Sequence, residues 1–146
     1  MNKILFKIIV CIIGFLSLGS YGQHLKKHKW ENRILIVKTS NIPSEKYENQ
    51  FKEFQNSSTE LKERKFIIYR IIKDEFTSTN YLTNKNSSGK VSKEMKNKIF
   101  NVNENFEVIL IGLDGNIKLQ KNEIITKENL FSRIDSMPMR KYELKN

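Results

Sequence analysis

The chain has 146 residues and a formal net charge of +10, and Cys11 is its single cysteine. Because Cys11 lies in an apolar segment that we expect to be removed, the mature protein should hold neither thiol nor disulfide, which excludes thiol–disulfide exchange and thiol peroxidase chemistry. The 21 lysines and 5 arginines are spread over every segment. This pattern favours solubility over nucleic-acid binding, for which arginine is better suited, and leaves polyanion binding as an alternative.

The N-terminal segment is predicted to be a signal peptide. Lys3 and Lys7 precede an apolar run at residues 8–16, and small residues at Ser20 and Gly22 suit a cleavage site before Gln23. The run is too short for a membrane span, which needs about 20 residues. The sequence therefore predicts a signal peptide over 1–22 and a single domain over 23–146, exported to the periplasm or secreted, with no transmembrane span in the mature chain.

The first half of that domain is predicted to form two strands joined by a helix. Residues 33–38 and 65–72 are short apolar runs rich in β-branched residues, typical of strands covered on both faces. A helix is predicted to begin at Pro43 and Ser44, with a break near 56–59. Its inner face is predicted to carry Tyr47, Phe51, Phe54 and Leu61.

The second half is predicted to begin with a polar loop over 77–89, followed by a short helix carrying Val91, Met95 and Ile99. Residues 106–112 and 116–120 should form a hairpin around Asp114-Gly115. Thr126 is expected to cap a last helix that ends in residues 137–140. The resulting order, β-α-β-α-β-β-α, predicts an α/β fold with three layers and a mixed four-stranded sheet, with parallel pairing across the first two crossovers and an antiparallel final pair.

Three segments carry a resemblance to a known family: residues 30–37, 111–119 and 134–140, the last containing Met-Pro-Met-Arg. With them the chain resembles a secreted domain of unknown function that is shared by exported bacterial proteins and by animal sushi-repeat-containing and equarin-type extracellular proteins. The resemblance implies a thioredoxin-like fold with no established activity. It extends over residues 28–143, nearly the whole predicted mature chain.

In a thioredoxin-type fold, redox chemistry is performed after the first strand, at the start of the first helix. Here that place holds Thr39, Ser40, Asn41 and Ser44, with hydroxyls and an amide but no sulfur. Helix capping is the simpler explanation of the serines, because a serine nucleophile needs an adjacent base. An enzyme or small-ligand site on this loop, using its backbone N–H groups, is the alternative.

The lead-in to the first strand contains three residues of interest. His24 and His28 are four apart but have no nearby carboxylate or thiolate, so we expect them to be solvated and predict no metal site and no cofactor. Trp30 is expected to close the edge of the core; if it is exposed, we expect it to contact a partner.

The C-terminal residues Met137, Met139 and Arg140 form a candidate docking edge, because methionine adapts to apolar partners and arginine adds a directional anchor. Packing of both methionines under the helix end and an ion pair between Asp135 and Arg140 are the alternatives. From these features we expect an exported, non-redox binding or adaptor module whose partner is an envelope or extracellular protein, and no catalytic residue is assigned.

Overall fold

The computed structural model describes residues 23–40 and 44–146. The predicted signal peptide and Asn41 lie outside these ranges. The described chain is an α/β structure with one mixed sheet of six strands in the order β4-β3-β2-β1-β5-β6. β1 and β2 are parallel, and every other neighbouring pair is antiparallel. The strands are β1 (Arg33–Thr39), β2 (Phe66–Ile72), β3 (Glu75–Asn80), β4 (Lys85–Lys90), β5 (Phe106–Ile111) and β6 (Ile117–Lys121).

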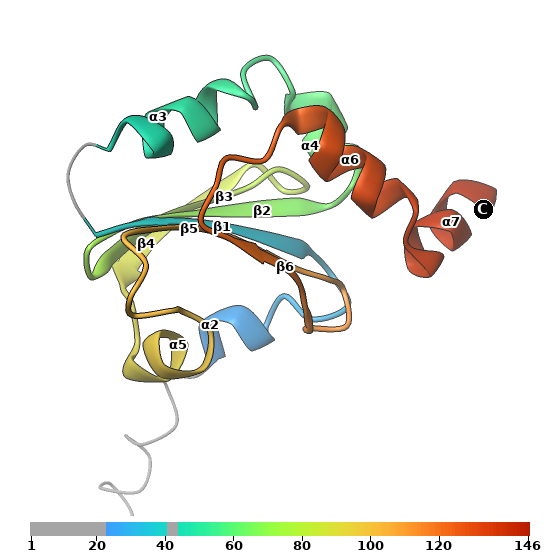
Figure 1. Cartoon of the computed structure of the whole chain (residues 1–146). Helices are drawn as coiled ribbons and strands as arrows, with labels where there is room; N and C mark the ends of the chain where they lie inside the picture. Colours follow the sequence, from blue (N-terminus) through green and yellow to red (C-terminus); the bar gives the residue numbers. More distant parts are fainter. Residues whose placement is uncertain (1–22, 41–43) are drawn as a thin grey trace, which may run out of the picture.

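Helices cover the sheet on both faces, which makes three layers. In Figure 1, α3, α4 and α6 lie above the sheet, α2 and α5 lie below it, and α7 extends beyond the end of α6. None of the helices in the described ranges is long and apolar enough to cross a membrane. Their bounds are α2 (Gln23–Lys26), α3 (Glu45–Lys52), α4 (Ser58–Glu63), α5 (Lys93–Lys98), α6 (Lys127–Asp135) and α7 (Pro138–Lys145).

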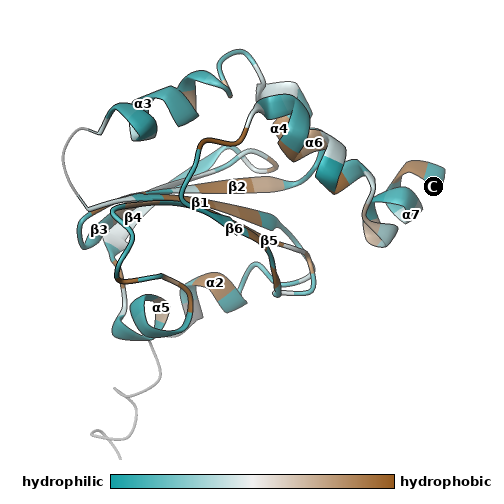
Figure 2. Cartoon of the chain, in the orientation of Figure 1, coloured by the Kyte–Doolittle hydropathy of each residue, from teal (hydrophilic) through white to brown (hydrophobic). Residues whose placement is uncertain are grey.

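The face under α3, α4 and α6 holds the larger apolar core. Alternate residues of β1, β2 and β5 meet the inner sides of the helices there, because side chains of a strand point to opposite faces in turn. Figure 2 shows the apolar residues concentrated in the central strands and the polar residues on the outer sides of the helices. The fully buried members of this core include Leu35, Val37, Leu61, Phe66, Ile68, Val108, Leu110, Leu130 and Ile134.

The opposite face is apolar as well, but α2 and α5 are short and cover it incompletely. Its buried cluster contains Ile34, Ile36, Tyr69, Phe76, Met95, Ile109 and Ile111, among others. β1 and β5 are buried along their whole length, and for β1 this agrees with the prediction of a strand covered on both faces. The incomplete cover of this face leaves a cavity, described below.

The prediction of a four-stranded sheet with a polar loop over 77–89 is wrong. Those residues form most of the β3–β4 hairpin, which pairs with β2 and extends the sheet by two strands. Every residue of β4 is exposed, so it lacks the apolar alternation that marks a half-buried strand. The hairpin contacts the core mainly through Phe76, whose ring lies so close to Gly89 that a Cβ there would be 3.0 Å from it.

The pairing of the third predicted strand was also wrong. β5 does not run parallel to β1 and β2 but antiparallel to β1, with Ile36 opposite Ile109. The β5–β6 hairpin is antiparallel as predicted, and Gly115 adopts a φ of +79° in its turn.

The predicted helices agree with the structure near the first strand and differ from it at the C-terminal end. The expected break after the first long helix is confirmed: α3 ends at Lys52 and α4 begins at Ser58. The last helix, however, ends at Asp135, and Pro138 begins the separate helix α7 instead of closing α6. Proline fits this position because the first turn of a helix does not need its missing N–H group.

Candidate functional site

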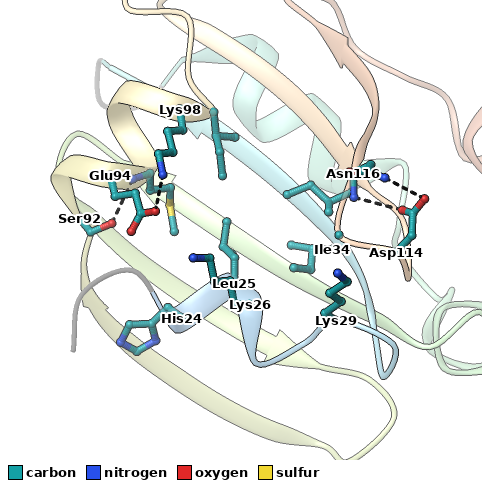
Figure 3. A pocket seen from close by; sticks show the side chains of 14 residues that line it. His24, Leu25, Lys26, Lys29, Ile34, Ser92, Glu94, Lys98, Asp114 and Asn116 are labelled. Atoms are coloured by element: carbon teal, nitrogen blue, oxygen red, sulfur yellow. Dashed lines mark hydrogen bonds and ion pairs between the residues drawn. The ribbon is translucent and has the colours of Figure 1, made fainter. Parts of the chain in front are cut away.

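A cavity of about 450 Å³ lies between α2, α5 and the β5–β6 turn. Its size is within the range of small-ligand sites. Figure 3 shows that side chains from both sheet and helices border it. The apolar part of its lining consists of Leu25 from α2, Ile34 from β1, Met95 and Ile99 from α5 and its end, and Ile111 from β5.

Charged side chains border the same cavity. Glu94 lies 2.8 Å from the Nζ of Lys98, and Asp114 lies 2.7 Å from the Nζ of Lys118. The hydrogen bond from Lys98 holds the pKa of Glu94 below its ordinary value, and that from Lys118 does the same for Asp114. Both acids are therefore ionised at neutral pH and already paired with a lysine.

Two further lysines in the lining, Lys26 and Lys29, lack a carboxylate within ion-pairing distance among the described residues. The Nζ of Lys29 lies 5.3 Å from the centre of the Trp30 ring, a cation–π arrangement. The lining thus contains two lysines without an ion pair, whereas both of its acids are paired, so the border carries a net positive charge.

The segment that carries α2 is fixed to the sheet through histidine, contrary to the expectation of a solvated lead-in. His28 is buried, and its Nε2 lies 2.9 Å from the hydroxyl of Tyr69. Burial lowers the pKa of His28 and raises the pKa of Tyr69 to about 12. His24 borders the cavity and packs edge-on against Phe76. Within the described ranges, no group of three or more His, Cys, Asp or Glu side chains is placed to hold a metal.

Trp30 does not close the edge of the core. Its side chain is 60% exposed, and its backbone adopts a φ of 69°. Its N–H donates to the carbonyl oxygen of Leu113 at 2.7 Å, which joins the turn after α2 to the β5–β6 hairpin. The ring therefore lies beside the cavity border, next to Lys29, and not in the core.

A buried ion pair supports the α5 side of the cavity, and sequence reasoning missed it. Lys38 and Glu107 face one another across β1 and β5 at 2.7 Å, with side chains only 8% and 2% exposed. Lys38 also donates to the carbonyl oxygens of Asn101 and Glu104, and the N–H of Asn101 donates to Glu107. The pair thereby fixes the loop that follows α5. Opposite charges at the same end of two otherwise apolar strands were the available signal.

Of the predicted alternative site at residues 39–44, the structure describes Thr39, Ser40 and Ser44. Thr39 is buried at the end of β1, and the backbone N–H of the exposed Ser40 donates to Asn105. Ser44 caps α3 by accepting from the N–H of Tyr47 at 3.1 Å, as helix capping requires. Thr39 and Ser44 line a second cavity of about 350 Å³, whose lining among the described residues contains neither histidine nor cysteine.

The three residues of the predicted docking edge are not brought together on the surface. Arg140 is only 7% exposed: it pairs with Asp135 at 3.2 Å and donates to the carbonyl oxygen of Glu63. Met137 is half-buried against the larger core, whereas Met139 is exposed. The guanidinium of Arg140 is therefore engaged in contacts within the molecule.

Arg140 belongs to a charge cluster that fastens α7 to the sheet. Arg33 on β1 and Arg140 both lie close to Glu143, at 3.1 and 3.5 Å, and Arg64 binds Asp135 at 2.6 Å. Burial alone would raise the pKa of Glu143, but the hydrogen bond and charge of Arg33 outweigh it and hold that pKa below its ordinary value. α7 is thus held largely by charge pairs, and its exposed side carries apolar residues.

Comparison with known proteins shows a family and no function. Residues 24–143 match the family described as a domain of unknown function (DUF4174). The chain belongs to this family. The match covers every described strand and both helices that border the cavity, except for the first residue of α2. No curated protein and no solved structure matches the chain.

Proposed function

We propose that this DUF4174 chain is an exported, thioredoxin-like binding domain without a redox centre, and that its binding site is the cavity under α2 and α5. The observation that carries the proposal is the cavity itself, about 450 Å³ with an apolar lining and a polar border. Ligand sites combine these properties because apolar area supplies affinity and a few polar groups fix orientation.

The element order supports the thioredoxin-like part of the proposal. β1, α3 with α4, β2, α5, β5, β6 and α6 follow one another in the β-α-β-α-β-β-α order, and β3 and β4 are an addition beyond β2. The place where such folds carry their thiol is occupied by Thr39, Ser40 and Ser44. Binding, and not electron transfer, is the activity compatible with these side chains.

Nile red, a neutral apolar dye, tests whether the cavity binds ligands. Titrating the purified protein should give a saturable rise in dye fluorescence. Ile99→Phe, which places a larger side chain in the cavity, should weaken dye binding. Val102→Phe is the matched control, because Val102 is 81% exposed and lies outside the cavity lining. Equal binding by both variants, or no saturable binding to the parent protein, would contradict the proposal.

A second candidate is an adaptor that docks an envelope or extracellular protein through α7. It is favoured by Tyr142 and Leu144, which are 71% and 62% exposed on a helix whose inner side is fixed by charges. Affinity capture from envelope extract should then lose its partner with Tyr142→Ser plus Leu144→Ser. Capture should persist with Leu82→Ser, which alters an exposed apolar residue at the β3–β4 turn. Equal capture by all proteins would contradict docking through α7.

The loop site and polyanion binding are weaker candidates. The cavity beside Ser44 is smaller than that under α2 and α5, and the Ser44 hydroxyl already accepts a hydrogen bond from the backbone of α3. Polyanion binding would use the dispersed lysines and should disappear as salt is raised, because such contacts release counterions. Binding in the apolar cavity should persist in the same salt.

A further inference from the structure

We propose that the cavity takes a soluble amphipathic carboxylate, with the apolar body of the ligand between α2 and α5 and its carboxylate at the border that carries Lys26 and Lys29. This inference rests on the proposed function and adds the chemical class of the ligand.

The charge at the border favours an anion. Figure 3 shows Lys26 and Lys29 on the α2 side of the cavity and Lys98 on the α5 side. The two acids in the lining, Glu94 and Asp114, are hydrogen-bonded to Lys98 and Lys118. Within the described ranges neither Lys26 nor Lys29 has an ion pair, although the charge of Lys26 helps to lower the pKa of Glu94. An incoming carboxylate can therefore pair with either lysine without breaking an existing ion pair.

The apolar lining favours a ligand with a hydrocarbon or aromatic body. Leu25, Ile34, Met95 and Ile111 come from four different elements and line the cavity together. Ile34 and Met95 are buried, so these side chains offer apolar surface at the inner end of the site. Removing apolar ligand surface from water there supplies most of the binding free energy, and the flexible thioether of Met95 adapts to ligand shape. A small inorganic anion would leave this surface unused.

Trp30 reports on the anion end of the site. It is the single tryptophan of the chain, and the Nζ of Lys29 lies 5.3 Å from its ring centre. A carboxylate that draws the Lys29 amine into an ion pair alters the charge next to the indole. Binding should therefore change tryptophan emission even though the ligand body lies on the other side of Lys29.

The experiment titrates the purified protein with monomeric decanoate and follows both Trp30 emission and calorimetric heat. Neutral 1-decanol, acetate and anionic phospholipid vesicles are the comparison ligands. The tested variant is Lys26→Met with Lys29→Met, which keeps the apolar stems and removes the charges. Lys62→Met is the matched control, an exposed lysine on α4 at the opposite face of the sheet. Circular dichroism confirms that each variant is folded.

The expected result is that decanoate binds the parent and Lys62→Met equally and binds the double variant about five- to tenfold more weakly, as for two partly exposed ion pairs. Decanol should bind both equally, and acetate should not bind. Equal binding of decanoate by all proteins, with decanol as tight, would overturn the anion class and leave the cavity proposal intact. Binding of vesicles without decanoate would overturn the soluble ligand, and binding of no apolar ligand would overturn both proposals.

Discussion

Both faces of the sheet are apolar, but helices close them differently. Under α3, α4 and α6, three helices cover the strands, and the buried core combines leucine, phenylalanine and isoleucine from the sheet and from these helices. Under α2 and α5, two short helices cover a cluster dominated by isoleucine, and this face also holds a cavity and a buried ion pair. One face therefore mainly supplies stability, and the other combines stability with space for a ligand.

The largest expected effect is on the open face, at its buried ion pair. Lys38→Met should lower the free energy of unfolding by about 3–5 kcal/mol, because it leaves the Glu107 carboxylate buried without its cation. Adding Glu107→Gln should restore much of the loss. Urea unfolding of the single and double variants measures both effects. A loss in the double variant as large as in Lys38→Met would contradict a role for the unpaired charge.

Shortening a buried side chain should lower the free energy of unfolding by different amounts on the two faces of the sheet. Leu130→Ala, on the closed face, should lower the free energy of unfolding by about 3–4 kcal/mol, since it creates an enclosed cavity. Met95→Ala, on the open face, should cost about 1–2 kcal/mol, because the space it leaves joins a cavity that already exists. Chemical denaturation compares the two variants. Equal costs would show that the faces are packed alike.

The charge cluster under α7 should have an intermediate effect. Arg140→Met should lower the free energy of unfolding by about 1–3 kcal/mol, since Asp135 keeps Arg64 and Glu143 keeps Arg33 as partners. Limited proteolysis should then cut within α7 before the sheet. If cutting were unchanged, the cluster would not be what fastens α7.

The same cluster should make the free energy of unfolding depend on pH in the acidic range. The pKa of Glu143 is lowered on folding from an ordinary value of 4.5, so its contribution is present above that pH and is lost as pH falls through the lower folded value. In the Glu143→Gln variant, the free energy of unfolding measured with urea should therefore change less with pH below about pH 4.5 than it does in the parent protein. An unchanged acid slope would show that Glu143 gains no net charge stabilisation in the fold.

His28 should give the smallest effect, at mildly acidic pH. Its pKa is lowered on folding from 6.5 by burial, so the unfolded chain binds a proton more readily. Stability is therefore fully present above about pH 6.5 and declines as pH falls below it. His28→Gln should remove this part of the pH dependence in thermal unfolding between about pH 5 and 7. If the stability of the variant changed with pH over this range as that of the parent does, the burial of an uncharged His28 would be contradicted.

The parts of the fold that sequence predicts well are those where apolar patterning decides the structure. β1, β2 and β5 are mainly apolar, and the capping residues Ser44 and Thr126 mark helix starts within one residue. The β3–β4 hairpin was missed because β4 is polar on both sides, and its place is decided by pairing with β3.

The candidate site was harder to predict than the fold, because it is assembled from segments distant in sequence. Leu25, Met95 and Ile111 are far apart along the chain and become neighbours only when the helices fold under the sheet. Two residues that the sequence singled out have other roles: Arg140 forms an internal ion pair, and Ser44 caps α3. A short, weakly apolar helix opposite a mainly apolar strand was the remaining hint of an incompletely covered face.

Ligand binding under α2 and α5 can be located by an NMR titration of the isotope-labelled protein with decanoate. Amide shifts should change in α2, α5 and the β5–β6 turn, with saturation at one equivalent, while α3, α4 and α6 stay unchanged. Shifts concentrated around Ser44 or α7, or none at all, would contradict the assignment of the binding site to the open face of the sheet.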